Sequence, residues 1–320
     1  MTQLDALVIG SGVSGLTTAI SLAEAGLKTR IRSAAPPLRS TSAAAGAVWG
    51  PVMCGPAGRT HEWARTGLEV MSMLADEPAA GIRQVSGREV SRIPADPPAW
   101  TSLLPGGATP CPQRDLPEGF VSGWRYTAPL ATMPVYLSYL QERFMLAGGQ
   151  IEYAEVTSLR EVSEAPLLVN CTGTGARSLV PDSEVIPVRG QVVIVANPGV
   201  EDFYIDHSQG PPDYVYYFPH GATVLLGGTA EEGAWDLPAR PDVAMRIVAD
   251  CVRANPLLEG AEVLEHRVGL RPFRPSVRLE SEPLPGGRVL WHNYGHGGAG
   301  VTLSWGCARE ITDTVLAAAS

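Results

Sequence analysis

The feature that most constrains the fold is residues 6–15, ALVIGSGVSG, which run straight into a helical segment. Four apolar residues without polar alternation are typical of a strand buried on both faces of a parallel sheet. In the glycine-rich turn that follows, the first glycine permits the tight turn, the second lets a pyrophosphate approach the backbone, and the third lets the helix pack closely. A helix predicted over residues 13–25 directs its N-terminal amides at the phosphates, and a strand from residue 29 completes a βαβ unit. The turn therefore predicts a dinucleotide site made by Gly10, Ser11, Gly12, Val13, Ser14 and Gly15.

The end of the second predicted strand leaves the identity of the dinucleotide open. A site of this type usually has Asp or Glu here to bind the adenosine ribose, and this chain has Ser33. A serine hydroxyl still hydrogen-bonds a ribose hydroxyl, more weakly than a carboxylate does. Arg30 and Arg32 would instead suit a 2′-phosphate. On this loop alone, a phosphorylated nicotinamide cofactor remains an alternative.

Composition excludes several classes of function. The net charge is −9, which argues against a nucleic-acid partner, since such proteins favour a basic face. The five cysteines are widely spaced and form no CxxC pair, so we expect no metal site and a reducing, cytoplasmic setting. The first strand begins within a few residues and no apolar run reaches bilayer-spanning length, so we expect neither a signal peptide nor a membrane partner.

The order of predicted elements indicates an α/β fold with an insertion. Up to residue 184 we predict two further helices and two further strands, at 60–76, 133–147, 150–153 and 167–170, with an irregular connection at 94–117. The pattern then changes to antiparallel strands with one helix, at 191–196, 214–219, 223–228, 242–253 and 263–273, before a strand at 288–291 and a helix at 299–316. We therefore predict a Rossmann-like nucleotide-binding domain from residues 1–184 and 276–320, and an inserted, mainly antiparallel sheet domain from residues 185–275.

The segment 36–51, PPLRSTSAAAGAVWGP, is rich in small and hydroxyl side chains. Such a segment contributes little to a core and suits the close approach of backbone to a flat ligand, although a solvent loop remains the alternative.

A family resemblance narrows these alternatives. Residues 292–308, HNYGHGGAGVTLSWGCA, closely resemble the C-terminal signature of the D-amino-acid oxidase family of flavoenzymes. The likeness extends, in the order of the family, to five further segments: 45–49, 169–173, 187–191, 226–229 and 269–275. It spans nearly the whole chain and implies FAD rather than a nicotinamide, so that the Rossmann-like domain would be an FAD-binding domain and the insertion a substrate domain.

The resemblance also implies roles for individual residues. Arg271 matches the arginine that binds the substrate α-carboxylate, a task that suits the planar fork of a guanidinium. Tyr216 matches a tyrosine that contacts the same carboxylate, although Tyr214 and Tyr217 are close enough to confuse the assignment. Gly298 matches the carbonyl that accepts a hydrogen bond from the amine. For the cofactor, the glycine-rich turn is joined by Ser33, Arg39, Ser40, Thr41, Ala45, Gly46, Val156, Cys171, Thr172, Gly173, Arg271, Gly297, Gly298, Ala299, Gly300, Val301 and Thr302.

The implied reaction is oxidative deamination of a D-amino acid, by hydride transfer from Cα to flavin N5, with dioxygen reoxidising the flavin to give hydrogen peroxide. The imino acid then hydrolyses to a 2-oxo acid and ammonia. His292 and His296 are interpreted as turn residues, because no proton transfer requires them. Since residues 200–237 contain no Lys or Arg, we expect neutral substrates rather than D-aspartate.

Three alternatives stay open. One is a related oxidase of D-aspartate, glycine or sarcosine, and another is a non-catalytic flavin-binding sensor. The third alternative concerns the oligomeric state, because the sequence is compatible with a homodimer. Two departures from the family pattern predict a more open active site: residues 207–213 are short and lack a lid tyrosine, and Ala299 stands where some relatives have a bulky aromatic residue.

Overall fold

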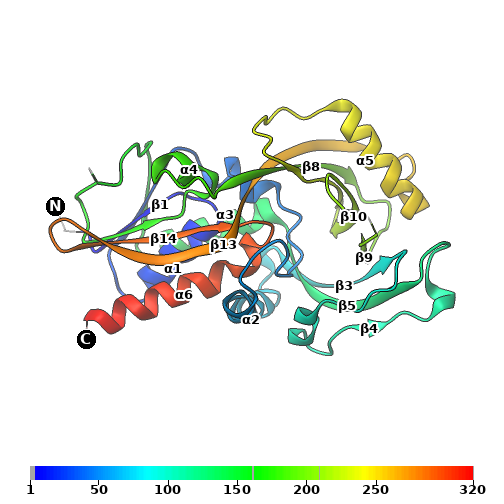
Figure 1. Cartoon of the computed structure of the whole chain (residues 1–320), viewed down its shortest axis with the longest axis horizontal. Coiled ribbons are helices and arrows are strands. Elements are labelled where there is room, and N and C mark those ends of the chain that lie inside the picture. The colour runs from blue at the N-terminus through cyan, green and yellow to red at the C-terminus, as the bar shows by residue number, and fades with distance from the viewer. Residues whose placement is uncertain (1–3, 161, 209, 320) are drawn as a thin grey trace.

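A computed structural model describes residues 4–160, 162–208 and 210–319. In these residues the strands join into one 14-stranded sheet, in the order β4-β5-β3-β9-β10-β11-β8-β13-β14-β7-β1-β2-β6, with β12 paired to β8. The sheet extends along the long axis of the molecule (Figure 1). Its left half in this view is the parallel part, and its right half is the antiparallel part.

The parallel part contains the predicted βαβ unit. It consists of β1 (Ala6–Ile9), β2 (Thr29–Ser33), β6 (Gln150–Tyr153), β7 (Leu167–Asn170) and the start of β14 (Arg288–His296), all mutually parallel where they pair. Every residue of β1 and β7 is buried, as the apolar run in β1 predicts. The covering helices are α1 (Val13–Glu24), α2 (Ala57–Leu74), α3 (Met133–Leu146) and α6 (Gly300–Ala319), and their apolar faces share one core with β1.

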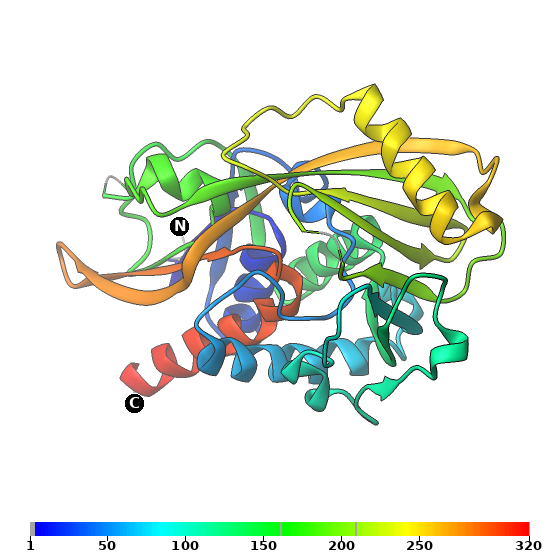
Figure 2. The same cartoon turned by 45° about the vertical axis from the view of Figure 1, so that its right-hand side comes forward.

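The antiparallel part is built on long strands. It contains β8 (Ile186–Ala196), β9 (Phe203–Asp206), β10 (Asp213–His220), β11 (Thr223–Thr229), β12 (Glu231–Glu232) and β13 (Val263–Leu284). Helix α5 (Pro241–Ala254) lies across β8, β10 and β11, and its residues Val243 and Ile247 enter a second core (Figure 2). The Rossmann-like domain with an attached antiparallel sheet is thus confirmed.

Two features of the sheet differ from the sequence prediction. Strands β3 (Ile82–Ser91), β4 (Thr109–Pro110) and β5 (Ser122–Ala131) extend the antiparallel part beyond β9, although no strand was predicted there. Strand β3 alternates poorly between buried and exposed positions, so its sequence lacks the usual period of two. Strand β13 also continues past residue 275 and pairs with both β8 and β14. The division at 184 and 275 stays a prediction.

The remaining elements are short: helix α4 (Ala176–Leu179) and single-turn 3-10 helices at Pro37–Arg39, Thr41–Ala44, Pro78–Ala80, Ala99–Leu103, Gln113–Asp115, Gly173–Gly175 and Pro256–Leu258. Within the described ranges, no helix has both the length and the apolar character needed to cross a bilayer. The same ranges hold no cluster of three or more His, Cys, Asp or Glu side chains that could bind a metal ion.

Candidate active site

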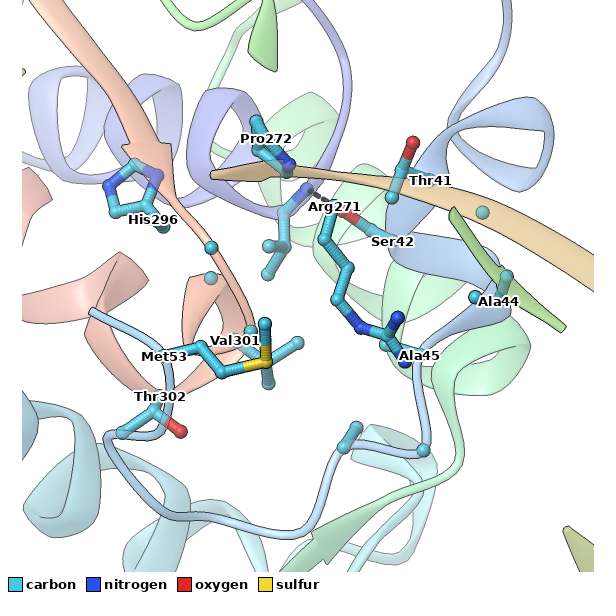
Figure 3. Close-up of a pocket in the computed structure, with 18 of the residues that line it drawn as sticks. Thr41, Ser42, Ala44, Ala45, Met53, Arg271, Pro272, His296, Val301 and Thr302 are labelled. Atoms are coloured by element: carbon cyan, nitrogen blue, oxygen red, sulfur yellow. Dashed lines mark hydrogen bonds between the residues drawn. The ribbon is translucent and has the colours of Figure 1, made fainter. Parts of the chain in front are cut away.

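A cavity of about 670 Å³ lies where the two parts of the sheet meet. Its walls come from the carboxyl end of β1, the loop of residues 40–53, strands β10 and β13, and the start of α6. Figure 3 shows Arg271 reaching into this space from β13, while Met53, Val301 and Thr302 border it from the other side. The size is within the range of roughly 300–1,000 Å³ typical of ligand and cofactor sites.

The glycine-rich turn forms one end of the cavity. Gly10 has φ +107°, and a Cβ added to it would lie 2.5 Å from the carbonyl oxygen of Cys171. A Cβ on Gly15 would lie 2.0 Å from the carbonyl oxygen of Gly10, so α1 packs against the turn as predicted. Gly12 is the N-cap of α1 and has no side-chain acceptor, and among the first amides the N–H of Val13 donates to the Oγ of Ser42 at 3.0 Å. The start of α1 therefore presents backbone amides to the cavity, which is an anion-binding arrangement.

The arginines of β2 are not available to a phosphate. Arg32 lies 2.8 Å from a carboxylate oxygen of Glu152 and 2.8 Å from one of Glu164, and Arg30 lies 3.9 Å from Glu152. Neither arginine lines the cavity, whereas Ser33 does, with its hydroxyl hydrogen-bonded to Ser11 and to the carbonyl of Ala35. The structure therefore removes the basis for a 2′-phosphate at this point.

The turn before α6 forms the middle of the cavity. Gly297 has φ +55°, and a Cβ there would lie 2.0 Å from the carbonyl oxygen of Met53, so only glycine fits. The hydroxyl of Thr302 donates to the carbonyl of Gly50 and accepts from its N–H, both at 3.1 Å. Thr302 therefore fastens the 50-loop to α6, and its hydroxyl hydrogen is already used within the protein.

Three buried groups near this turn, His292, His296 and Cys171, have pKa values shifted so that their neutral forms are favoured. Burial lowers the pKa of His296 to about 4, so its imidazole is neutral near pH 7, and burial also lowers the pKa of His292. Burial raises the pKa of the Cys171 thiol to about 12, which excludes a thiolate nucleophile. Among the described residues, the Nε2 of His296 and the Oδ1 of Asn293 have no hydrogen-bond partner, and both residues line the cavity.

The substrate end brings Arg271 and Tyr216 together. Arg271 donates from Nη1 to the carbonyl of Thr229 at 3.0 Å, and no carboxylate in the described residues lies within 4.0 Å of its guanidinium. The guanidinium lies flat against Gly190, where a Cβ would be 2.3 Å from Nη1. Arg271 is the only Lys or Arg among the described residues that line the cavity. It is a partly buried cation with unused N–H donors, which is suited to binding a carboxylate.

The structure separates Tyr217 from the other two neighbouring tyrosines of β10. Tyr217 points to the opposite face, where its ring stacks on Tyr204 at 5.3 Å between centroids. Tyr214 and Tyr216 both line the cavity. Burial raises the pKa of Tyr216, while the positive charge of Arg271 acts against that rise, so the phenol remains a hydrogen-bond donor at neutral pH. Its ring leans across Gly227, where a Cβ would be 2.0 Å away.

Most of the residues singled out in the sequence are thus brought to one cavity. Those that line it are Gly10, Ser11, Gly12, Val13, Ser14, Ser33, Ser40, Thr41, Ala45, Gly46, Cys171, Thr172, Gly173, Tyr216, Arg271, Gly297, Gly298, Gly300, Val301 and Thr302. Four do not: Gly15 lies behind the turn, Arg39 is exposed, Val156 packs against the cluster that contains Leu7, and Ala299 is buried in the main core.

Sequence reasoning missed a group of cavity residues contributed by the antiparallel part. Trp100, Tyr126, Glu89 and His207 all border the cavity. Glu89 and Tyr126 lie on β3 and β5, two strands that the sequence pattern does not predict. A regular alternation of apolar and polar residues would have indicated these strands, and this alternation is weak in β3.

Comparison with known proteins agrees with this geometry. The family described as FAD dependent oxidoreductase matches residues 5–314. The chain is 47% identical over 316 residues to a D-amino-acid oxidase of Rubrobacter xylanophilus, covering 98% of this chain and 97% of that one. It is 44% identical over 308 residues to a D-amino-acid oxidase of Streptomyces coelicolor, covering 96% and 95%.

A solved structure has the same fold. The glycine oxidase of Geobacillus kaustophilus superposes with a TM-score of 0.83 at 19% identity, covering 99% of this chain and 95% of that one. The match of the family over nearly all of the sequence, together with relatives well above 30% identity, shows that this chain belongs to the FAD dependent oxidoreductase family.

Proposed function

We propose that this protein is an FAD-dependent oxidase that deaminates neutral D-amino acids, with dioxygen as the electron acceptor. The observation that carries the proposal is Arg271, a cation without a carboxylate partner among the described residues, in the same cavity as the glycine turn before α6. The names of the two relatives at 47% and 44% identity support the substrate class.

The cavity fits FAD in three respects. The start of α1 offers backbone amides to a pyrophosphate, and the carboxyl end of β2 offers a serine hydroxyl to the ribose. The small residues Ala45, Gly46, Gly297 and Gly298 in the cavity wall leave room for a flat ring system. When bound, FAD would accept two electrons and the Cα hydrogen of the substrate and pass them on to dioxygen. Gly297, Gly298 and Val301 would hold its ring system at the start of α6, where helix amides favour developing negative charge.

The chain's own residues would position the substrate. Arg271 would bind the α-carboxylate through the donors that its bond to Thr229 leaves free, and Tyr216 would donate its phenol hydrogen to the same group. The carbonyl of Gly298 would accept from the neutral amine. Holding both the carboxylate and the amine on the α-carbon directs its hydrogen towards the cofactor, so positioning would supply much of the rate enhancement. No proton transfer is assigned to His292 or His296.

The electrostatics of the cavity support neutral over acidic substrates. Apart from Arg271, the charged residues that line it are Glu89, Asp206 and the titratable His207. A substrate with a second carboxylate would meet Glu89 without a further Lys or Arg partner in the described lining, which is costly in a buried site. This disfavours D-aspartate. A non-catalytic sensor is disfavoured because Arg271, a partly buried arginine without a carboxylate partner in the described residues, is expensive without a guest.

Two finer statements are part of the proposal. A cytoplasmic location is supported by five free cysteines among the described residues. A homodimer stays a prediction, and light scattering on the purified protein measures it.

The test is a substrate panel with detection of hydrogen peroxide. We expect turnover of D-alanine and larger neutral D-amino acids, none of their L-enantiomers, and slower turnover of D-aspartate, glycine and sarcosine. Faster turnover of D-aspartate would overturn the neutral preference. Peroxide production from glycine or sarcosine alone would replace the proposed substrate class, and a flavin-containing protein without any turnover would favour the sensor.

A further inference from the structure

A second group of hydrogen-bonded polar side chains lies at the wall of the cavity formed by β3, β5 and β9. The carboxylate of Glu89 accepts from the indole Nε1 of Trp124 at 3.0 Å and is 2.5 Å from the Nε2 of His207. It also accepts a short hydrogen bond from the hydroxyl of Tyr126. Glu89 is only 2% exposed, yet it lines the same cavity as Arg271. Buried carboxylates are rare without a structural or functional reason.

The register of the sheet places Glu89 on the same face as the proposed substrate clamp. Across four neighbouring strands, Trp124 is opposite Glu89, Glu89 is opposite Ile205, and Ile205 is opposite Tyr216. Residues directly opposite one another point to the same face of a sheet. Glu89 is therefore two strands from Tyr216, roughly 10 Å along the sheet. A substrate whose carboxylate is held at Tyr216 can direct its side chain along this row.

The carboxylate keeps spare acceptor capacity. Its three donors leave about one of its roughly four lone-pair sites unused. His207 is its only cationic partner among the described residues. Although burial lowers the pKa of His207, its hydrogen bond to Glu89 and the negative charges of Glu89 and Asp206 raise that pKa above the ordinary value. The Glu89–His207 pair is balanced when His207 is protonated, and Glu89 supplies the negative charge on this face, since Asp206 is opposite Val90 and Val215 on the other face of the sheet.

We propose that Glu89, held in place by Trp124, Tyr126 and His207, is a specificity-determining residue of the substrate side-chain subsite. It lets the site accept D-amino acids whose side chains end in an amine or a guanidinium in addition to the neutral ones, by raising kcat/KM for these cationic side chains. This inference rests on the proposed D-amino-acid oxidase function and deepens it. A side chain with N–H donors takes the free acceptor site, whereas an apolar one leaves it unsatisfied.

The experiment compares D-lysine with D-norleucine, which has the same carbon chain but no ammonium group. For each enzyme, the ratio of kcat/KM for D-lysine to that for D-norleucine is measured per bound flavin. We expect Glu89→Gln to lower this ratio by about tenfold or more, mainly through KM for D-lysine. We expect His207→Gln to raise it, because the glutamine keeps a donor for Glu89 but removes the positive charge that offsets it. Glu118→Gln, an exposed carboxylate in the loop before β5, is the matched control and leaves the ratio unchanged.

The opposite signs separate specificity from a structural role. The inference is wrong if Glu89→Gln lowers kcat/KM equally for D-lysine and D-norleucine. It is also wrong if Glu89→Gln and His207→Gln shift the ratio in the same direction. Should Glu89→Gln fail to retain flavin, His207→Gln alone decides, and an unchanged or lowered ratio refutes the inference. Wild-type oxidation of D-norleucine without D-lysine refutes the subsite but leaves the proposed function intact. Absence of any D-amino acid oxidation refutes the proposed function itself.

Discussion

Replacing Arg271 with alanine tests the substrate clamp. In the structure the guanidinium of Arg271 donates one hydrogen bond to the carbonyl of Thr229 and has no carboxylate partner among the described residues. Its remaining donors would bind the substrate carboxylate. Truncating one member of a buried, hydrogen-bonded charge pair costs about 2–5 kcal/mol. Because each 1.4 kcal/mol is tenfold, kcat/KM for D-alanine should fall by about 30-fold to several thousand-fold.

The assay measures hydrogen peroxide production per bound flavin, so that loss of cofactor is not mistaken for loss of substrate binding. Arg271→Lys should fall between alanine and the wild type, because lysine keeps the charge but loses the planar fork. The control is Arg253→Ala on α5, whose exposed pair with Asp250 contributes little, so kcat/KM should change by less than about twofold. If Arg271→Ala stays within about threefold of the wild type, the carboxylate binds elsewhere and the reasoning fails.

Three further predictions concern the same cavity. Tyr216→Phe keeps the ring stacked on Phe218 but removes the phenol donor. Because a hydrogen bond of this kind contributes about 1 kcal/mol, kcat/KM for D-alanine should fall by about five- to tenfold. An unchanged kcat/KM would show that Tyr216 does not bind the substrate carboxylate. Gly297→Ala places a Cβ 2.0 Å from the Met53 carbonyl oxygen at φ +55°, so the purified variant should lose flavin absorbance; full retention would contradict the tight fit. The pKa of His296 is about 4 in the folded protein and near 6.5 when unfolded, so the unfolded state binds more protons and the free energy of unfolding falls as pH drops from about 6.5 towards 4. Urea titrations at pH 7 and pH 5 measure this decrease in the free energy of unfolding. The decrease should be about 2 kcal/mol smaller in His296→Gln than in the wild type, and an equal decrease in both proteins would refute the lowered pKa of His296.

The sequence predicted the features whose physical cause is local. The apolar run of β1 and the spacing of Gly10, Gly12 and Gly15 specify a buried strand, a turn and a close helix within ten residues. The small-residue turn before α6 is equally local, because Gly297 adopts φ +55°, a conformation that glycine takes readily. The lining of one cavity by Arg271 and this turn followed from the family resemblance, since the two come from different strands of the β13–β14 pair, which are connected through residues 285–287.

Features that depend on pairing between distant strands were not predictable in this way. Glu89, Trp124 and His207 come from three separate segments, and nothing near each of them indicates that they meet. The pairing of β3 with β5 and β9 brings them together, and β3 lacks a clear alternation of buried and exposed residues. Likewise, the ion pairs of Arg32 depend on Glu152 and Glu164, more than a hundred residues away.

The most direct measurement is the reduction of bound flavin without oxygen. The purified protein should be yellow, and adding D-alanine under anaerobic conditions should bleach the visible absorption band of the oxidised flavin, whereas L-alanine should not. Admitting air should restore the band with release of hydrogen peroxide. A yellow protein that no D-amino acid bleaches, or that both enantiomers bleach equally, would contradict the account.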